Sequence, residues 1–237
     1  MTNPKQKVAI VTGANRGIGF ESCRQLAQLG IQTILTSRSE SLGQEAAKVL
    51  QQEGLPVTAY PMDITDLESI IALAKFVDQS FGGCDILINN AGVYLDKTGD
   101  NVDPMLVDIE IMRQSMETNA FGMMRVMQQL IPLMNGCGNV VNVGSIMGQL
   151  SKMTARHPAY RTSKTAVTAL TLIFADRLKD TEIRVNAVCP GWTQTEMGGD
   201  NAPRTVQQGV QTIIWLATLP PDGPTGGFFQ DHRSLHW

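Results

Sequence analysis

Three side chains that could move a proton stand close together in the second half of the chain. Tyr160 follows Ser145 by fifteen residues, and Lys164 comes four residues later. Tyr160 and Lys164 would share one face of a helix. Pro158 can occupy the first turn of this helix, where a backbone N–H is not needed. A neighbouring ammonium makes a phenol, with its ordinary pKa of about 10, a usable proton donor. The apolar run 140–144 predicts a strand that ends beside Ser145, where open α/β sheets bind ligands. Tyr and Lys at this spacing are often ordinary surface residues, so the interpretation needs further motifs.

A glycine-rich loop near the N-terminus is the first of those motifs. The run 7–12 predicts a strand, and Gly13, Gly17 and Gly19 follow it at the start of a predicted helix. Glycine allows the backbone to turn sharply and approach a pyrophosphate, which the positive end of the helix then binds. Such glycines often form only a turn, but here they lie between a strand and a helix, as a dinucleotide site requires.

The next predicted strand, 31–37, distinguishes NADP from NAD. An NAD site places Asp or Glu about 20 residues after the glycine loop, where it binds the ribose 2′-hydroxyl. This chain has Ser37 and Arg38 there, and Arg16 inside the glycine loop. Two guanidinium groups suit a 2′-phosphate, because charge-assisted hydrogen bonds contribute about 1.5–3 kcal/mol each. Both arginines could instead be solvated surface charges, but the missing carboxylate favours NADP(H) as the cofactor.

These features and their order resemble the short-chain dehydrogenase/reductase family over nearly the whole chain. The matching stretches are 12–19, 62–63, 89–92, Asn119, Ser145, Tyr160 with Lys164, and 190–191. The resemblance implies an α/β single-domain Rossmann fold, with a doubly wound parallel sheet of about seven strands and helices on both faces. It also implies exchange of the pro-S hydride between NAD(P) and an alcohol/carbonyl pair.

The resemblance assigns roles to individual residues. Its catalytic set is Asn119, Ser145, Tyr160 and Lys164, in which Asn119 holds a water in a proton relay to Lys164. Lys164 also binds the ribose hydroxyls and lowers the pKa of Tyr160, and Asp63 contacts the adenine amino group. The residues placed on the cofactor are Gly13, Asn15, Arg16, Gly17, Ile18, Gly19, Ser37, Arg38, Asp63, Ile64, Asn90, Ala91, Gly92, Tyr160, Lys164, Pro190, Gly191, Trp192, Thr193 and Thr195.

Two segments narrow the resemblance to the carbonyl reductase branch of the family. They are 190–197 and the C-terminal stretch 226–237. This branch uses NADPH and reduces ketones and aldehydes with apolar substituents. Its monomeric animal members carry a long insertion between the catalytic Ser and Tyr, whereas 14 residues lie between Ser145 and Tyr160 here. We therefore expect a homodimer or a homotetramer.

A mostly apolar group of side chains should surround the carbonyl substrate. A charged substrate would need a fixed cation, so we expect an uncharged, partly hydrophobic ketone or aldehyde. Lys152 and Arg156 lie near these residues in the sequence and could supply such a cation, so a charged substrate stays an alternative. The predicted pocket consists of Ser145, Ile146, Met147, Leu150, Met153, Trp192 and Met197.

Two other functions fit part of the pattern. A 3-oxoacyl-(acyl-carrier-protein) reductase would share the catalytic residues, but it needs a basic patch that docks an acidic carrier. Arg125, Arg161 and Lys164 do not obviously form one. A non-catalytic NADP(H)-sensing protein would share the fold, since fold alone does not determine function. A sensor has no need for the complete catalytic set, which favours the enzyme.

Composition indicates a cytoplasmic globular protein with one domain, 1–237, whose cofactor-binding half is about 1–144 and catalytic part about 145–237. The formal net charge of −3 argues against nucleic acid as a partner. The start of the chain has no signal-peptide core, and no apolar run approaches the ~20 residues of a membrane span. The cysteines are scattered and are expected as reduced thiols rather than metal ligands: Cys23, Cys84, Cys137 and Cys189.

Strand and helix patterns alternate along the chain, which predicts a parallel sheet covered on both faces. Strands are expected near 7–12, 31–37, 56–61, 85–89, 138–144, 183–189 and 225–229, and helices near 17–29, 40–53, 66–80, 105–133, 158–179 and 203–218. The helix 105–133 is rich in methionine, which suits core packing and a subunit interface equally. Asn119 in its middle competes for backbone hydrogen bonds, so we expect a kink there unless the side chain simply points into solvent.

Overall fold

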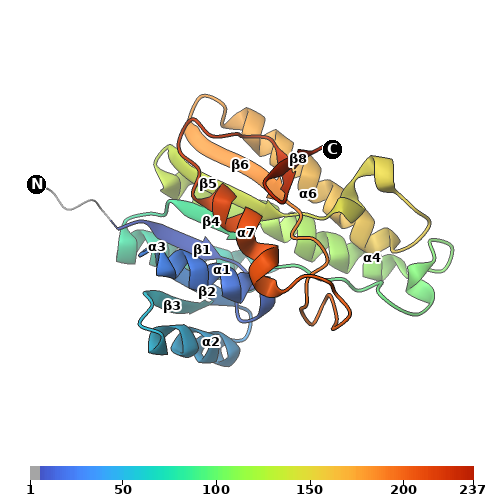
Figure 1. The fold of residues 1–237 in the computed structure, drawn as a ribbon, viewed down its shortest axis with the longest axis horizontal. Coiled ribbons are helices and arrows are strands. Elements are labelled where there is room, and N and C mark those ends of the chain that lie inside the picture. Colours follow the sequence, from blue (N-terminus) through green and yellow to red (C-terminus); the bar gives the residue numbers. More distant parts are fainter. Residues whose placement is uncertain (1–5) are drawn as a thin grey trace, which may run out of the picture.

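One sheet of eight strands forms the centre of the computed structural model, which describes residues 6–237 (Figure 1). The strands lie in the order β3-β2-β1-β4-β5-β6-β7-β8, and all neighbours are parallel except β7 and β8. Their bounds are β1 Val8–Val11, β2 Gln32–Ser37, β3 Val57–Pro61, β4 Ile86–Asn89, β5 Cys137–Val143, β6 Glu182–Val188, β7 Phe228–Gln230 and β8 Arg233–Leu235. The order reverses between β1 and β4, and such a reversal is where doubly wound sheets bind ligands.

Helices cover both faces of this sheet (Figure 1). One face carries α1 Gly17–Gln28, α2 Glu40–Gln52 and α7 Val206–Ala217, and the other carries α3 Leu67–Phe81, α5 Met123–Leu130 and α6 Pro158–Arg177, with α4 Ile109–Met116 packed on α6. Successive strand residues point to opposite faces. In β1, Ala9 and Val11 therefore pack in the first core, and Val8 and Ile10 pack in the second. The predicted doubly wound α/β fold is confirmed.

The methionine-rich helix differs from the single predicted helix 105–133. It begins at Ile109 and contains a π-helical turn, η2 Glu117–Gly122, between α4 and α5. Asn119 lies in this turn, so the expected interruption is present, and its side chain is buried rather than solvated. Gly122 packs closely on the backbone of Ile64, where an added Cβ would lie 2.7 Å from the carbonyl oxygen. Single π-turns inside helices are frequent at functional sites.

The sequence analysis missed the last strand and gave a count of about seven. β8 pairs antiparallel with β7 through a turn at Asp231 and His232, which both have left-handed backbone angles. Turns of this kind are usually marked by Asn and Gly. Asp followed by His is a weak signal, and three residues are too few to show an alternating pattern.

The methionines between 105 and 134 were expected either in the core or at a subunit interface. Met123, Met127 and Met134 are buried in the core beneath the sheet, which confirms core packing for these three. Met105 precedes α4, and its side chain is 86% exposed.

Within residues 6–237, no helix has both the length and the apolar character needed to cross a membrane.

Leu73 in α3 provides a test of this packing. Its side chain is fully buried, whereas Leu67 at the start of the same helix is 44% exposed. We expect Leu73→Ala to lower the free energy of unfolding by about 2–5 kcal/mol, because it removes buried methyl groups and leaves a cavity. Leu67→Ala should lower it by less than about 1 kcal/mol. Urea unfolding of both variants measures the difference, and equal losses would contradict the assigned core.

Candidate active site

The loops after β1 and β4 are joined by hydrogen bonds at the reversal of the sheet. The Thr12 hydroxyl accepts the backbone N–H groups of Asn90 and Ala91, each at 3.0 Å. The Asn90 amide donates to the carbonyl oxygens of Thr12 and Gly13, each at 2.9 Å. Gly13 has a left-handed φ of 61°, and an added Cβ would lie 2.9 Å from the Cα of Ala91. The glycine loop and the 89–92 segment therefore form one rigid unit.

The start of α1 is open towards this unit and could bind a phosphate. An added Cβ at Gly19 would lie 2.5 Å from the Asn90 amide nitrogen and 2.8 Å from the Gly13 carbonyl oxygen, so only glycine allows this close approach. Arg16 is the residue before the helix, and its guanidinium reaches Glu196 instead of capping the helix. The first N–H groups of α1 are suited to a pyrophosphate, as predicted for Gly13 to Gly19.

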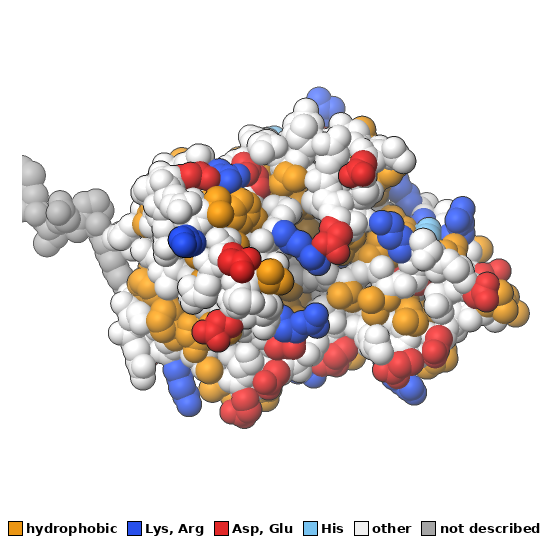
Figure 2. Space-filling view, turned by 90° about the horizontal axis from the view of Figure 1, so that it is seen from below, with side chains coloured by type: hydrophobic (Ala, Val, Ile, Leu, Met, Phe, Trp, Pro, Cys, Tyr) orange, Lys and Arg blue, Asp and Glu red, His pale blue; other side chains and the backbone are white. Residues whose placement is uncertain are grey.

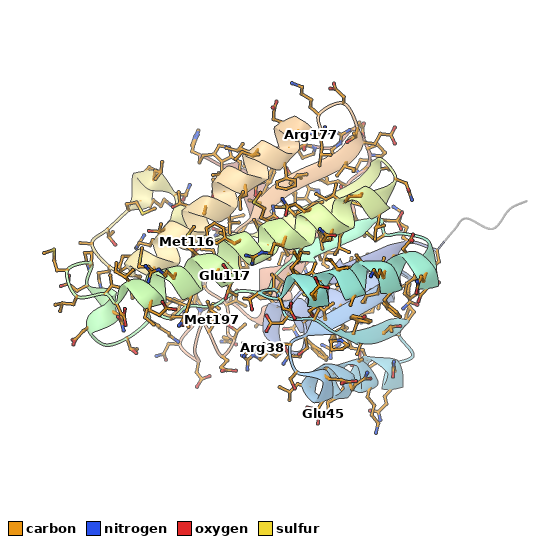
Figure 3. The ribbon with its side chains drawn as sticks, turned by 180° about the vertical axis from the view of Figure 1, so that it is seen from behind. Arg38, Glu45, Met116, Glu117, Arg177 and Met197 are labelled. Carbon is orange, nitrogen blue, oxygen red and sulfur yellow. The ribbon has the colours of Figure 1, made fainter. Side chains whose placement is uncertain are left out.

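A cavity of about 920 Å³ lies beside the predicted adenosine site. Arg38 and Thr65 line one side of it, and residues of α4 and the π-helical turn line the other, including Glu117 (Figure 3). Figure 2 shows a hollow near the middle of one face of the molecule, with charged side chains at its rim. An exposed guanidinium at this position is available to an anionic ligand.

The structure gives different surroundings to four other predicted cofactor residues. Ser37 is buried at the end of β2. The Asp63 carboxylate accepts hydrogen bonds from the backbone and the hydroxyl of Thr65, at 2.8 and 2.7 Å, so one of its oxygens is already used. The Ile64 side chain belongs to the core, and Ile18 packs against the other core. Any contact of Ile64 with a cofactor must therefore use its backbone.

Tyr160 and Lys164 lie one turn apart in α6, and both side chains are buried. The Lys164 ammonium donates to the Val143 carbonyl oxygen at 2.8 Å and lies 5.7 Å from the centre of the Tyr160 ring. The Ser145 hydroxyl lies near the phenol and accepts the N–H of Met147 at 3.1 Å. The three predicted groups therefore meet at the carboxyl end of β5.

The direction of the tyrosine pKa corrects the sequence analysis. Burial raises the pKa of Tyr160, the nearby Cys189 acts in the same direction, and the Ser145 hydroxyl lowers it only in part. Burial also lowers the pKa of Lys164 from 10.5 to about 8. The expected lowering of the tyrosine pKa by Lys164 is not seen here, because loss of water disfavours both charged forms. Tyr160 thus keeps its proton at neutral pH.

Asn119 joins the π-helical turn to the loop after β4. Its amide oxygen accepts the N–H of Val93 at 2.7 Å, and its amide nitrogen donates to the Val93 carbonyl and the Ser163 hydroxyl, each at 2.9 Å. Gly92 lies between Asn119 and Lys164, since an added Cβ would be 3.1 Å from the amide oxygen and 3.5 Å from the ammonium. The Asn119 side chain is thus committed to protein partners. Its amide oxygen has a second lone pair, and the water relay to Lys164 stays a prediction.

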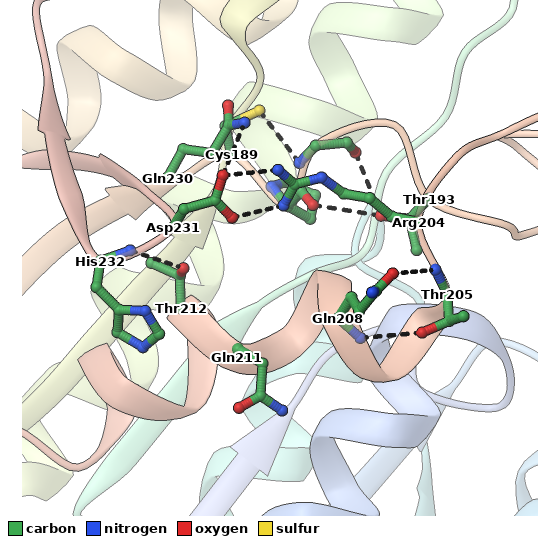
Figure 4. Close-up of polar contacts among 12 residues, drawn as sticks. Cys189, Thr193, Arg204, Thr205, Gln208, Gln211, Thr212, Gln230, Asp231 and His232 are labelled. Atoms are coloured by element: carbon green, nitrogen blue, oxygen red, sulfur yellow. Dashed lines mark hydrogen bonds and ion pairs between the residues drawn. The ribbon is translucent and has the colours of Figure 1, made fainter.

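The segment after β6 forms the wall opposite α6. Gly191 has a left-handed φ of 76°, and an added Cβ would lie 2.6 Å from the Arg204 guanidinium. Arg204 binds the Asp231 carboxylate through two hydrogen bonds of 2.6 Å each, which ties this wall to the C-terminal hairpin (Figure 4). Thr193 is buried, and its hydroxyl donates to the carbonyls of Pro190 and Gly191. Sequence reasoning missed Arg204 and Asp231, because 27 residues separate them.

Thr195 and Trp192 shape the outer part of the same wall. The Thr195 methyl group lies 3.2 Å from an added Cβ at Gly17, so this threonine faces the start of α1. The indole of Trp192 donates to the Gly198 carbonyl at 2.8 Å and is 58% exposed. Glu196 reaches across to Arg16, so the guanidinium predicted to bind a 2′-phosphate is held by this loop.

The predicted substrate residues surround an open side of the site. Leu150, Met153 and Met197 are exposed, and Ile146 packs against the small core cluster that contains Cys189. The 920 Å³ cavity is lined by other residues, so their role in substrate binding stays a prediction. Cys189 and Asp96, which lie next to Tyr160, were also missed.

A family model described as short chain dehydrogenase matches residues 7–205. The chain belongs to this family. Carbonyl reductase (NADPH) 1 of Homo sapiens is 36% identical over 276 aligned positions, covering 97% of this chain and 98% of the human protein. The rabbit (Oryctolagus cuniculus) protein of the same name is 35% identical over 278 positions, covering 98% and 99%. Both alignments are longer than the 237 residues of this chain, so the relatives contain segments that it lacks.

Solved structures agree with this assignment. The NADPH-bound carbonyl reductase from chicken fatty liver superposes with a TM-score of 0.86 at 25% identity, covering 99% of this chain and 100% of that one. Salutaridine reductase from Papaver somniferum gives 0.83 at 28% identity, covering 95% and 100%. As a short-chain dehydrogenase, the protein is an oxidoreductase with a Rossmann-like fold.

Lys164 provides a test of the buried charge. Because its pKa falls on folding, the unfolded chain binds more protons between pH 8 and 10.5, and stability should rise with pH across that range. Below pH 8, burial of the charged ammonium lowers the free energy of unfolding by about 3 kcal/mol, whereas its hydrogen bond to Val143 contributes about 1 kcal/mol of stability. Lys164→Met should therefore raise the free energy of unfolding at pH 7 by about 2 kcal/mol. Denaturant unfolding at pH 7 and pH 10 measures it, and a variant less stable at pH 7 would contradict this assignment.

Proposed function

We propose that this short-chain dehydrogenase reduces ketones or aldehydes with apolar substituents to alcohols, with NADPH as the hydride source and Tyr160 as the general acid. The observation that carries the proposal is the buried Tyr160 phenol, which lies beside Ser145 and one helical turn from Lys164 and whose pKa is raised by burial. A protonated acid is what an alkoxide requires, and positioned donors lower the energy of developing negative charge.

The residues present fit the cofactor that the carbonyl reductase relatives carry in their names. The tight glycine loop leaves room for a pyrophosphate at the start of α1. Arg38 is an exposed cation that lines the cavity beside the predicted adenosine site. When bound, NADPH supplies the hydride. Lys164 would hold the ribose hydroxyls, and Thr193 would support the nicotinamide wall from its buried position.

Three side chains then carry out the proton chemistry. The Ser145 hydroxyl and the Tyr160 phenol would donate hydrogen bonds to the carbonyl oxygen of the substrate. Tyr160 would release its proton to that oxygen as the carbon is reduced. Lys164, with a pKa of about 8, can lose and regain a proton near neutral pH and so could resupply the phenol.

A 3-oxoacyl-carrier reductase is less well supported by the charges around the site. Arg125 pairs with Glu117, and Arg161 donates to the backbone carbonyls of Met147 and Lys152. Lys164 is buried, so these three cations do not offer a docking patch to an acidic carrier. Turnover on a carrier-bound 3-oxoacyl thioester, compared with an aryl ketone, separates the two functions.

NADPH consumption on a panel of ketones, aldehydes and quinones is the direct test. We expect turnover with uncharged, partly apolar carbonyls. If none of these compounds supports the oxidation of NADPH, a binding role for NADP(H) would be the better account.

A cytoplasmic location and a homodimer or homotetramer also stay predictions. Light scattering of the purified protein measures the oligomeric state.

Tyr160→Phe tests the general acid. We expect turnover to fall by at least ~10²-fold, since the phenyl ring cannot donate a proton. NADPH binding, measured by fluorescence, should stay within about 2-fold of wild type, because Lys164 and the glycine loop are intact. Unchanged turnover in a folded variant would refute the role of Tyr160.

Arg38→Ala tests the choice of cofactor. Loss of a charge-assisted hydrogen bond to the 2′-phosphate should raise KM for NADPH by at least about 10-fold. KM for NADH should change by less than about 2-fold, because NADH has no phosphate there. KM for NADH in the same variant therefore serves as the control for KM for NADPH. Parallel changes for both cofactors would show that Arg38 does not bind the 2′-phosphate.

A further inference from the structure

The helix that carries Tyr160 begins without a capping side chain of its own. His157 precedes the helix with a left-handed φ of 58°, and its imidazole Nδ1 donates to the Asp96 carbonyl at 2.9 Å. Pro158 follows and has no N–H. The next two backbone donors, on Ala159 and Tyr160, therefore need an acceptor from elsewhere in the chain.

Asp96 supplies that acceptor from the loop after β4. One of its carboxylate oxygens accepts the N–H of Ala159 at 2.7 Å, and both accept the N–H of Tyr160 at 3.2 Å. Asp96 is fully buried, and no ion pair among residues 6–237 includes it. A buried carboxylate without a counter-ion is unfavourable unless hydrogen bonds and a helix N-terminus stabilise it. Its position at the first turn of α6 meets both conditions.

The same loop also touches the ring of Tyr160 and the opposite wall of the site. Tyr94 stacks on Tyr160, with ring centres 4.3 Å apart and an angle of 27° between the planes. Lys97 donates to the Met197 carbonyl at 2.9 Å, and Met197 is labelled in Figure 3. Asp96 lies between these two contacts in the chain. It therefore couples the backbone of Tyr160 to the loop that holds its ring.

We propose that Asp96 is a positioning residue for the reduction, which fixes the start of α6 and, through Tyr94, holds the Tyr160 ring in the orientation that donates its proton. This role rests on the proposed function of Tyr160. The carboxylate does not touch the reacting atoms, so its effect is exerted through the helix and the stacked ring.

The charge of Asp96 has a second consequence for Tyr160. Burial is the largest cause that raises the pKa of Tyr160, and Cys189, Tyr94 and the Asp96 carboxylate act in the same direction. The Lys164 ammonium lies 5.7 Å from the centre of the Tyr160 ring. Removing the Asp96 charge should thus lower the pKa of Tyr160, and the phenolate that alcohol oxidation requires should form at lower pH.

Asp96→Asn tests the proposal, with Asp108→Asn as the matched control. Asp108 also caps a helix, since its side chain accepts the N–H of Glu110, but that helix carries none of the proton-transfer groups. In Asp96→Asn we expect kcat for ketone reduction to fall by at least ~10-fold, because small misplacements of a catalytic group are costly. KM for NADPH should stay within about 2-fold. The rising limb of the pH profile for alcohol oxidation should move to lower pH, whereas Asp108→Asn should show neither change.

Three results would overturn the proposal or redirect it. Unchanged kcat per folded molecule and an unmoved limb in Asp96→Asn would overturn it. If Asp96→Asn does not fold, Tyr94→Leu decides: the cap stays and the stack is lost, so kcat should fall about 5-fold or more, and an unchanged kcat refutes the proposal. A wild-type protein that reduces no carbonyl would instead refute the proposed function itself.

Discussion

Burial of the Lys164 ammonium at the end of β5 is the constraint on which the site depends. A cation in this position is unfavourable for folding, and one hydrogen bond to the Val143 carbonyl offsets only part of that cost. Because Tyr160 lies one turn away on the same helix, the packing that buries Lys164 also removes water from the phenol. The site therefore exchanges stability for a dry, protonated acid, as functional sites often do.

The rest of the fold holds this helix against β5 and β6, with its first turns near the carboxyl ends of the parallel strands. Each loop at that end of the sheet is fixed by a bond to a distant segment. Thr12 binds the loop after β4, Asn119 binds the same loop from the π-helical turn, and Arg204 binds Asp231 in the last hairpin. A parallel sheet gathers these loops at one edge, since all its strands end there. Their bonds then convert loosely placed residues into a site with fixed walls.

The carbonyl reductase relatives align with nearly the whole chain and contain segments that it lacks. The wall formed after β6 reaches the start of α1 through Thr195 and through the Arg16–Glu196 pair. Both partners of that pair are largely exposed, so the contact contributes little free energy. By contrast, the side chains of Tyr160 and Lys164 are buried.

The sequence by itself determined the alternation of strands and helices, the glycine loop and the spacing of Ser145, Tyr160 and Lys164. Those features depend on local periodicity and on residue types a few positions apart, which the chain states directly. It also indicated the interruption at Asn119. Only the tertiary structure decided the direction of the tyrosine pKa, the partner of Arg16, the capping role of Asp96 and the strand β8. Burial, long-range hydrogen bonds and weak turns are set by segments that are distant in sequence, so local patterns cannot reveal them.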